Sequence, residues 1–285
     1  MYRKIISRIL FTLLLICNGV LSSYAAGGGG DSEEVKTTVD LDTKTLYKKI
    51  GEGACGHLGG IEATDMVVSK SANIIPEIKR GNSLDIGSGF GGATNYLKES
   101  GFRNIWGLDL DEESINYAKG KYPSINFIKA NALDIPDIFD EDFFSFVYMF
   151  NVACEIPDKV ELLQKIKNVT EENGLLAIFD YTALDLKQGD FKNVAGEEMY
   201  PLNMQKLKVL LRVIGWEVIE IVDVSDQYIK WCEDLLDTLY TKQELITTVS
   251  FSKEELDIIY KHYHHILEML KQKKLGGVII FAKKV

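Results

Sequence analysis

Short apolar runs alternate along this chain with segments whose apolar residues recur every three or four positions. Apolar runs bounded by turn residues predict strands, and the longer period predicts amphipathic helices. Predicted strands cover residues 82–87, 104–109, 125–129, 143–149, 174–180, 216–224 and 276–283. Predicted helices lie near residues 60–75, 91–100, 112–120, 158–169 and 203–214. This alternation predicts an α/β fold, in which helices cover both faces of a largely parallel sheet.

A long insertion, about residues 226–274, separates the last two predicted strands and carries two more helical runs. The first run includes Tyr228, Trp231 and Tyr240, and the second includes Tyr260 and Tyr263. Two interpretations stay open and are compatible. The pair packs its apolar stripe on the sheet, or it forms a helical cap that closes over a ligand.

The turn after the first predicted strand carries the most specific chemistry. Gly87, Gly89 and Gly92 satisfy the G-x-G-x-x-G pattern of dinucleotide sites, and Gly87, Gly89 and Gly91 satisfy G-x-G-x-G. Asp85 precedes both patterns. A carboxylate there repels a pyrophosphate and attracts the cationic amino group of S-adenosylmethionine (SAM). The turn therefore favours SAM over NAD.

A second acid, Asp109, ends the next predicted strand, twenty residues after Gly89. An acid in this position hydrogen-bonds ribose hydroxyls in both SAM and NAD sites. It supports an adenosine cofactor without separating the two.

These motifs, together with Ala130-Asn-Ala-Leu133 and the apolar run 143–149, resemble the class I SAM-dependent methyltransferases. The resemblance implies a Rossmann-like seven-stranded sheet with an antiparallel last strand, and SAM as cofactor. It places the methionine part on the glycine loop, the ribose on Asp109 and the adenine beside residues 131–133. The cofactor-binding residues it implies are Asp85, Gly87, Ser88, Gly89, Gly91, Asp109, Leu110, Asn131, Ala132, Leu133 and Asn151.

The stretch Gly59-Gly-Ile-Glu-Ala-Thr64 resembles the entrance motif of phosphoethanolamine N-methyltransferases and of glycine or sarcosine methylating enzymes. Three features depart from that subgroup. The entrance stretch lacks its tyrosine and serine, Glu155 stands where the subgroup has a histidine, and Glu198 stands where it has a phosphate-binding arginine. A glutamate repels phosphate, so an unphosphorylated amine is at least as plausible a substrate as a phosphobase.

We therefore predict SAM-dependent methyl transfer to a small molecule, at nitrogen, with Glu155, His57 and Tyr200 as candidate catalytic residues. One alternative is a non-catalytic binding protein with the SAM fold. Another is an NAD-dependent oxidoreductase, which Asp85 disfavours. No metal site is predicted, because His262 and His265 share a helix face without an identifiable third ligand.

The N-terminus has the order of a secretory signal. Within residues 1–26, basic residues precede an apolar run of about 13 residues, and small residues follow. We predict a signal peptide or membrane anchor there, a flexible linker over 27–43 and the methyltransferase domain over 44–285. This organisation implies an exported or membrane-anchored protein, or a cytosolic body held by an uncleaved anchor. Three widely spaced cysteines in the predicted mature chain form no disulfide framework.

The net charge of −10 without a basic patch makes nucleic acid an unexpected partner. It also disfavours docking on anionic lipid, except through the N-terminal segment. The sequence does not indicate an oligomeric state.

Overall fold

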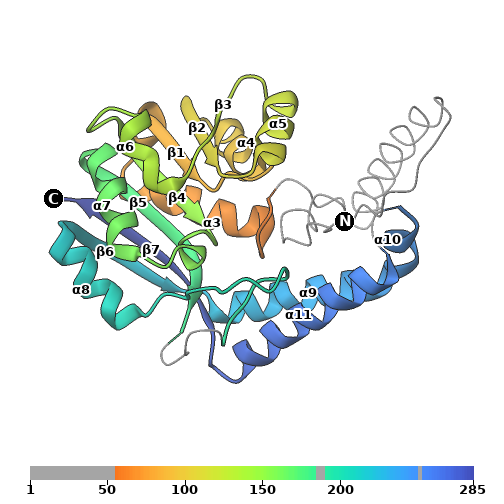
Figure 1. Cartoon of the computed structure of the whole chain (residues 1–285). Helices are drawn as coiled ribbons and strands as arrows, with labels where there is room; N and C mark the ends of the chain where they lie inside the picture. Colours follow the sequence, from red (N-terminus) through yellow and green to blue (C-terminus); the bar gives the residue numbers. More distant parts are fainter. Residues whose placement is uncertain (1–54, 184–189, 250–251) are drawn as a thin grey trace. The chain divides into compact units, whose positions relative to one another are not determined.

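A mixed seven-stranded sheet organises the chain in a computed structural model that describes residues 55–183, 190–249 and 252–285. Its strands are β1 (Asn82–Ile86), β2 (Asn104–Asp109), β3 (Asn126–Lys129), β4 (Phe144–Phe150), β5 (Thr170–Thr182), β6 (Trp216–Asp223) and β7 (Gly276–Lys284). The strand order is β3-β2-β1-β4-β5-β7-β6, and β7 runs antiparallel to both of its neighbours (Figure 1). The predicted fold class and its antiparallel last strand are confirmed.

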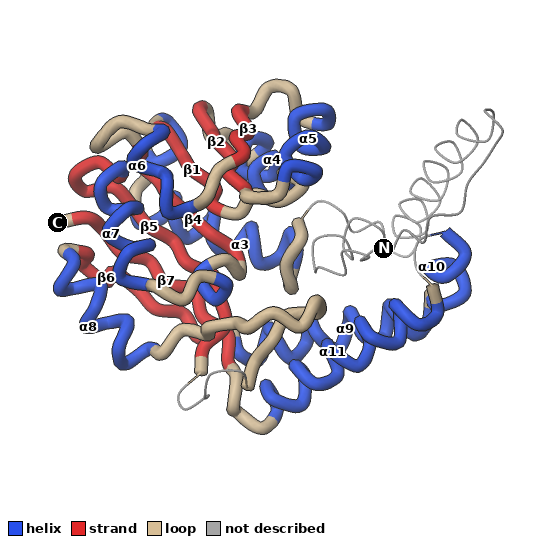
Figure 2. The backbone as a smooth tube through the Cα atoms, viewed as in Figure 1, coloured by secondary structure: helices blue, strands red, loops and turns tan. Residues whose placement is uncertain are grey.

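Helices cover both faces of this sheet (Figure 2). One face carries α3 (Gly60–Ile74), α4 (Gly92–Glu99), α9 (Ser225–Thr241) and α11 (Lys253–Lys271). The other carries α6 (Ile135–Ile138), α7 (Lys159–Val169) and α8 (Met204–Ile214). Helix α5 (Glu112–Lys121) packs on β3 in a smaller cluster, and α10 (Gln243–Val249) lies between α9 and α11 in the chain.

Strand β4 shows how the sequence specifies the two layers. Phe146, Tyr148 and Phe150 face the α3–α4–α9 side, whereas Val147 and Met149 face the α7–α8 side. The alternation follows from the two-residue period of a strand, and both sets are buried. A near-continuous apolar run is therefore what a central strand covered on both faces requires.

Strand β5 begins earlier than the predicted 174–180. Helix α7 ends at Val169 and the strand begins at Thr170, so Gly174 lies inside the strand. A Cβ on Gly174 would lie 2.7 Å from the carbonyl oxygen of Glu171. Asn173 before it has a φ of 66°, so the chain kinks here and only a residue without a side chain fits the bend.

The insertion forms the expected helices, and its first helix packs directly on the sheet. Tyr228 of α9 lies over Gly277 of β7, where a Cβ would come within 2.1 Å of the tyrosine ring. The predicted signal or anchor and the linker lie outside the described residues. Within the part of the chain that the structure describes, no helix is both long and apolar enough to span a bilayer.

Candidate cofactor and acceptor site

The glycine turn leaves β1 at the carboxyl edge of the sheet and leads into α4. Gly87 and Gly91 have φ values of 74° and 82°, a region that favours glycine. A Cβ on Gly87 would also lie 2.2 Å from a methyl carbon of Val152, and one on Gly91 would lie 2.7 Å from the Phe127 ring. The turn therefore needs glycine both for its conformation and for its close packing.

Asp109, at the end of β2, holds this turn in place. Its carboxylate accepts hydrogen bonds from the backbone N–H of Gly89 at 2.7 Å and from that of Asp111 at 3.0 Å. A carboxylate oxygen can accept more than one hydrogen bond, so ribose hydroxyls are chemically suitable donors to such a group. The acid expected to bind ribose thus also connects the ends of β1 and β2.

Asp85 is a buried carboxyl beneath the turn. Burial raises its pKa to about 7, and the hydroxyl of Thr94, which donates to it at 2.7 Å, acts in the opposite direction. A pKa this high means that no cationic group of the protein offsets the cost of burying the charged carboxylate. A bound ammonium group supplies such a partner.

The turn contains a further unsatisfied group. The hydroxyl of Ser88 is buried and has no hydrogen-bond partner among the described residues. Buried polar atoms are normally paired, so one without a partner in a backbone cradle fits a polar ligand. Together with the carboxyls of Asp85 and Asp109, this hydroxyl fits the charged and hydroxylated parts of SAM.

The remaining predicted cofactor residues follow along the same edge. Leu110 directly after β2 is 66% exposed, which leaves an apolar side chain free to cover an adenine ring. Asn131 after β3 caps a short turn, because its side chain accepts from the backbone N–H of Leu133 at 2.9 Å. Ala132 is buried and Leu133 is half-buried. Their roles toward adenine stay predictions.

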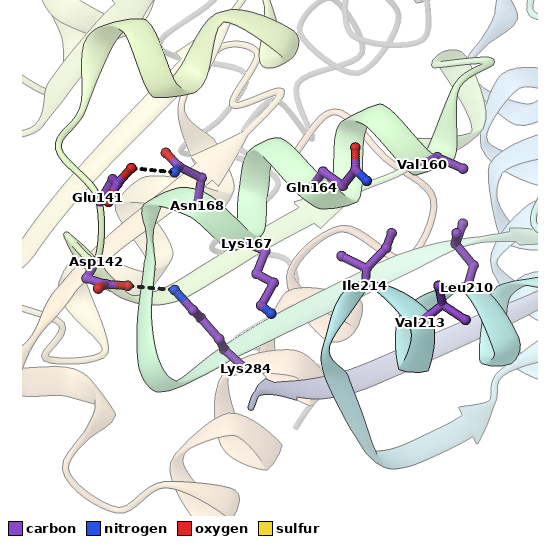
Figure 3. A pocket seen from close by; sticks show the side chains of 10 residues that line it. All are labelled: Glu141, Asp142, Val160, Gln164, Lys167, Asn168, Leu210, Val213, Ile214 and Lys284. Atoms are coloured by element: carbon purple, nitrogen blue, oxygen red, sulfur yellow. Dashed lines mark hydrogen bonds and ion pairs between the residues drawn. The ribbon is translucent and has the colours of Figure 1, made fainter.

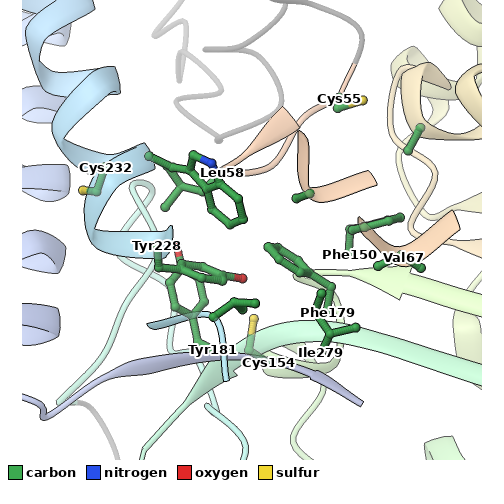
Figure 4. Packing of buried hydrophobic residues seen from close by; sticks show 14 of the residues in the cluster. Cys55, Leu58, Val67, Phe150, Cys154, Phe179, Tyr181, Tyr228, Cys232 and Ile279 are labelled. Atoms are coloured by element: carbon green, nitrogen blue, oxygen red, sulfur yellow. The ribbon is translucent and has the colours of Figure 1, made fainter. Parts of the chain in front are cut away.

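Aromatic side chains gather at the ends of β4 and β5, beside the predicted cofactor residue Asn151. Figure 4 shows Phe150, Phe179, Tyr181 and Tyr228 in this cluster. Phe179 stacks on Tyr228 with ring centroids 5.0 Å apart. Asn151, with a φ of 54°, donates its side-chain N–H to the Tyr228 hydroxyl at 2.9 Å. The cap helix α9 is thereby tied to the residue that ends β4.

His57 belongs to the same cluster. Its ring stacks on Phe150 at 4.4 Å with an interplanar angle of 4°, and burial lowers its pKa to about 4. Nδ1 lies 3.0 Å from the carbonyl oxygen of Leu58, which only accepts, so the neutral ring carries its proton on Nδ1. Nε2, 3.4 Å from the Thr64 hydroxyl, therefore presents a lone pair.

The other two candidate catalytic residues lie apart from His57. Glu155 is exposed at the end of the turn Ala153–Glu155. Tyr200 lies at a groove between α7 and α8, where its hydroxyl donates to Glu198 at 3.1 Å and Lys159 lies over its ring. The structure brings Asn151 and His57 to the aromatic cluster, and the backbone N–H of Tyr200 donates to the carbonyl oxygen of Cys154, a member of the same cluster.

Sequence reasoning missed two contacts that complete the site. The indole N–H of Trp231 on α9 donates to Glu62 on α3 at 3.1 Å, and its ring lies against Gly59. Thr94 supports Asp85 from the first turn of α4. A polar residue three positions after Gly91 was a usable signal for Thr94. Nothing local indicated the pairing of Glu62 with Trp231, since 169 residues separate them.

Comparisons with known proteins agree with this geometry. Residues 84–178 match the family model described as a methyltransferase domain. The chain is 28% identical over 176 residues to phosphoethanolamine N-methyltransferase of Plasmodium falciparum, covering 60% of this chain and 65% of that protein. It is 24% identical over 218 residues to O-methyltransferase rstn1 of Aspergillus nomiae, covering 73% and 86%.

A similar fold occurs in a solved structure of phosphoethanolamine N-methyltransferase 2 of Haemonchus contortus in complex with SAM. The TM-score is 0.72 at 17% identity, over 84% of this chain and 56% of that one. The chain thus spans less than two thirds of the length of both phosphoethanolamine N-methyltransferases. The matched segment contains the glycine turn, Asp109 and all of β4. Residues 84–178 therefore carry a methyltransferase domain.

Proposed function

We propose that this protein transfers the methyl group of SAM to the nitrogen of a small amine. The observation that carries the proposal is the juxtaposition of two features at one edge of the sheet. A glycine turn with buried Asp85 and the unpartnered Ser88 hydroxyl lies at the end of β1. An aromatic cluster lies at the ends of β4 and β5, joined to Asn151.

The aromatic cluster suits a cationic or methylated amine. Phe179, Tyr181, Tyr228 and Trp231 contact one another and are buried. A ring face stabilises an ammonium by about 0.5–2 kcal/mol. Glu198, in the place where related enzymes have a phosphate-binding arginine, bonds to Tyr200 instead. We therefore propose an amine without a phosphate group as the acceptor.

The residues of this chain would orient the amine and remove its proton, and bound SAM would supply the activated methyl group. Alignment of the acceptor and exclusion of water account for most of the acceleration in such a transfer. His57 is neutral at pH 7 and has a lone pair on Nε2, so we propose it as the proton acceptor. Burial lowers the pKa of His57 to about 4, so the ring is neutral at pH 7 and is a weak base.

Calorimetry with SAM and an assay for released S-adenosylhomocysteine test the proposal. We expect SAM to bind the parent protein, Asp109→Ala to weaken binding at least about 10-fold, and Asp137→Ala to bind normally. Two lost hydrogen bonds to a charged group justify this magnitude. Product should form with amines from a panel that also contains phosphorylated amines and hydroxyl compounds. Absence of SAM binding, or turnover of hydroxyl compounds only, would contradict the proposal.

A non-catalytic binding protein is the second candidate. The entrance stretch 53–58 lacks the tyrosine and serine of the resembled subgroup, and Glu155 in the place of its histidine is exposed. SAM binding without product from any amine would favour this candidate. Nicotinamide dinucleotide binding without SAM binding would favour the oxidoreductase instead.

We also propose that residues 1–26 are an export signal or a membrane anchor, as their charge and hydropathy pattern indicates. Intact mass and N-terminal sequencing of the protein from its native source distinguish the two. A start near residue 26 or 27 indicates cleavage, and an intact Met1 in the membrane fraction indicates an anchor. An intact Met1 in the soluble fraction would contradict both.

A further inference from the structure

Helix α8 presents an apolar stripe to solvent instead of a polar face. Val209 is 64% exposed and Val213 is 77% exposed. They lie one turn apart, so their side chains are neighbours on the helix surface. The opposite side of the helix, with Leu207 and Leu211, is buried against the sheet. Scattered exposed valines are ordinary, but two in register at the centre of the outer face of a helix form a patch.

Cations flank this stripe on both sides. At about 100° per residue, Lys206 lies on one side of the two valines, and Lys208 and Arg212 lie on the other. Helix α8 contains no acidic residue, although the whole chain has a net charge of −10. Within the described residues, none of the three side chains forms an ion pair. The three basic side chains are therefore not paired directly with an acidic side chain among the described residues, although Glu141 and Asp142 line the pocket beside Val213.

The patch continues into the groove between α7 and α8. A cavity of about 1040 Å³ there is lined by Val160 of α7 together with Leu210, Val209 and Val213. Figure 3 shows an adjoining pocket, which Val160 of α7 lines together with Leu210 and Val213 of α8, and which has Glu141 and Asp142 at its other end. Asp158, the acidic residue among those lining the cavity, already caps α7 by accepting from the backbone N–H of Glu161 at 2.9 Å.

We propose that this face, defined by Val209, Val213, Lys206, Lys208 and Arg212, docks the protein on the surface of an anionic lipid bilayer. An apolar stripe bordered by cations is the arrangement of a helix that lies in the membrane interface. The valines enter the boundary between headgroups and acyl chains, and the long basic side chains reach the lipid phosphates. A purely electrostatic partner such as nucleic acid leaves the central valines without a role. The proposal does not depend on methyl transfer.

Sedimentation with vesicles tests the proposal on the full chain. We expect the parent protein to bind vesicles of phosphatidylcholine with 30% phosphatidylglycerol and to bind pure phosphatidylcholine much more weakly. Reversing the three charges (K206E/K208E/R212E) should weaken binding by about 100-fold or more, because each basic residue contributes roughly fivefold. The pair V209S/V213S should weaken it about 10-fold. Matched controls are Lys119→Glu on α5 and Ile258→Ser, an exposed residue on α11.

Every variant keeps the same N-terminus, so a membrane-directed segment there contributes equally to all. Circular dichroism and SAM titration establish that each variant is folded. Loss of binding in both α8 variants, with both controls unchanged, supports the proposal. Three results overturn it: no binding by the parent, equal binding of the α8 variants and the parent, or equal binding to pure phosphatidylcholine. If vesicles fail and an acidic protein binds this face instead, the surface is a protein interface.

Discussion

The carboxyl of Asp85 connects the electrostatics of the site to the stability of the protein. Its pKa of about 7 in the folded chain lies above the ordinary value of 3.8, because burial disfavours the charged form. The folded state thus binds this proton more tightly than the unfolded state. The stability that the protonated form gives to the folded protein is fully present below about pH 4 and is lost as the pH rises to about 7. A cationic ligand beside the carboxylate restores this stability.

We predict that Asp85→Asn stabilises the ligand-free protein at pH 8, by up to about 4 kcal/mol, and abolishes the pH dependence of stabilisation by SAM. The amide still accepts the Thr94 hydroxyl, so the change removes mainly the charge. Thermal unfolding at pH 6 and pH 8, with and without SAM, measures both effects. In the parent, SAM should raise the melting temperature more at pH 8. Equal shifts at both pH values in the parent would contradict the assignment of Asp85 to the ammonium.

Tyr228 supports a similar prediction on the acceptor side. Tyr228→Phe removes the hydroxyl that accepts from Asn151 and leaves the ring stack on Phe179 intact. We expect the free energy of unfolding to fall by about 1 kcal/mol. The KM for the acceptor should rise several-fold, since the end of β4 loses its tie to the cap. Tyr240→Phe is the control, because Tyr240 lies on the same helix and is 70% exposed. Equal effects of the two substitutions would show that the bond to Asn151 is unimportant.

At the scale of elements, α9 is fastened to α3 by the bond between Trp231 and Glu62. We predict that Trp231→Phe and Glu62→Gln are coupled by about 1 kcal/mol in a double-mutant cycle. The phenylalanine keeps most of the packing on Phe179 and loses the indole N–H, whereas the glutamine keeps an acceptor without the charge. Urea unfolding of the parent, the two single variants and the double variant provides the cycle. Additive effects would mean that the two helices dock through packing alone.

The elements themselves could be predicted because their signals are local. Buried strands such as β4 are runs of apolar residues. Helix α8 is marked at its start by the N-cap residue Asn203 and at its end by Gly215, which adopts the left-handed conformation. The start of β5 was not predictable in this way, because Glu171, Glu172 and Asn173 are exposed polar residues in an irregularity of the strand, between the paired residues Thr170 and Leu175.

The cofactor side of the site likewise has local sequence signals, whereas the acceptor side does not. The glycine turn and Asp109 are recognisable because one chain segment carries each motif. The acceptor side depends on contacts across the sheet: His57 stacks on Phe150, and Asn151 bonds to Tyr228. Spacing along the chain does not encode such contacts. Tyr200 is a further example, because its backbone hydrogen bond to Cys154 and its hydroxyl bond to Glu198 could not be read from its place in the sequence.

At the scale of the whole molecule, three thiols report on how it opens. Cys55, Cys154 and Cys232 are free and buried, and burial raises the pKa of Cys55 to about 11 and that of Cys232 to about 12. Burial likewise raises the pKa of Cys154 well above its ordinary value. Thiolates are the reactive species, so these thiols react only after the surrounding structure opens. Cys154 lies at the end of β4, and Cys232 lies between α9 and α11, where its thiol approaches the Tyr263 carbonyl at 3.2 Å.

We predict that a thiol reagent labels Cys55, Cys154 and Cys232 together, at the rate of global unfolding, and that SAM at 100 times its Kd slows this labelling about 100-fold. Mass spectrometry of peptides after timed labelling assigns each rate. The bonds from α9 to Asn151 and to Glu62 are the reason to expect one cooperative unit. Faster labelling of Cys232 than of Cys154 would show that the cap opens by itself. In Trp231→Phe that separation should appear, because the cap then keeps its connections to β6 and β7 but has lost its hydrogen bond to α3.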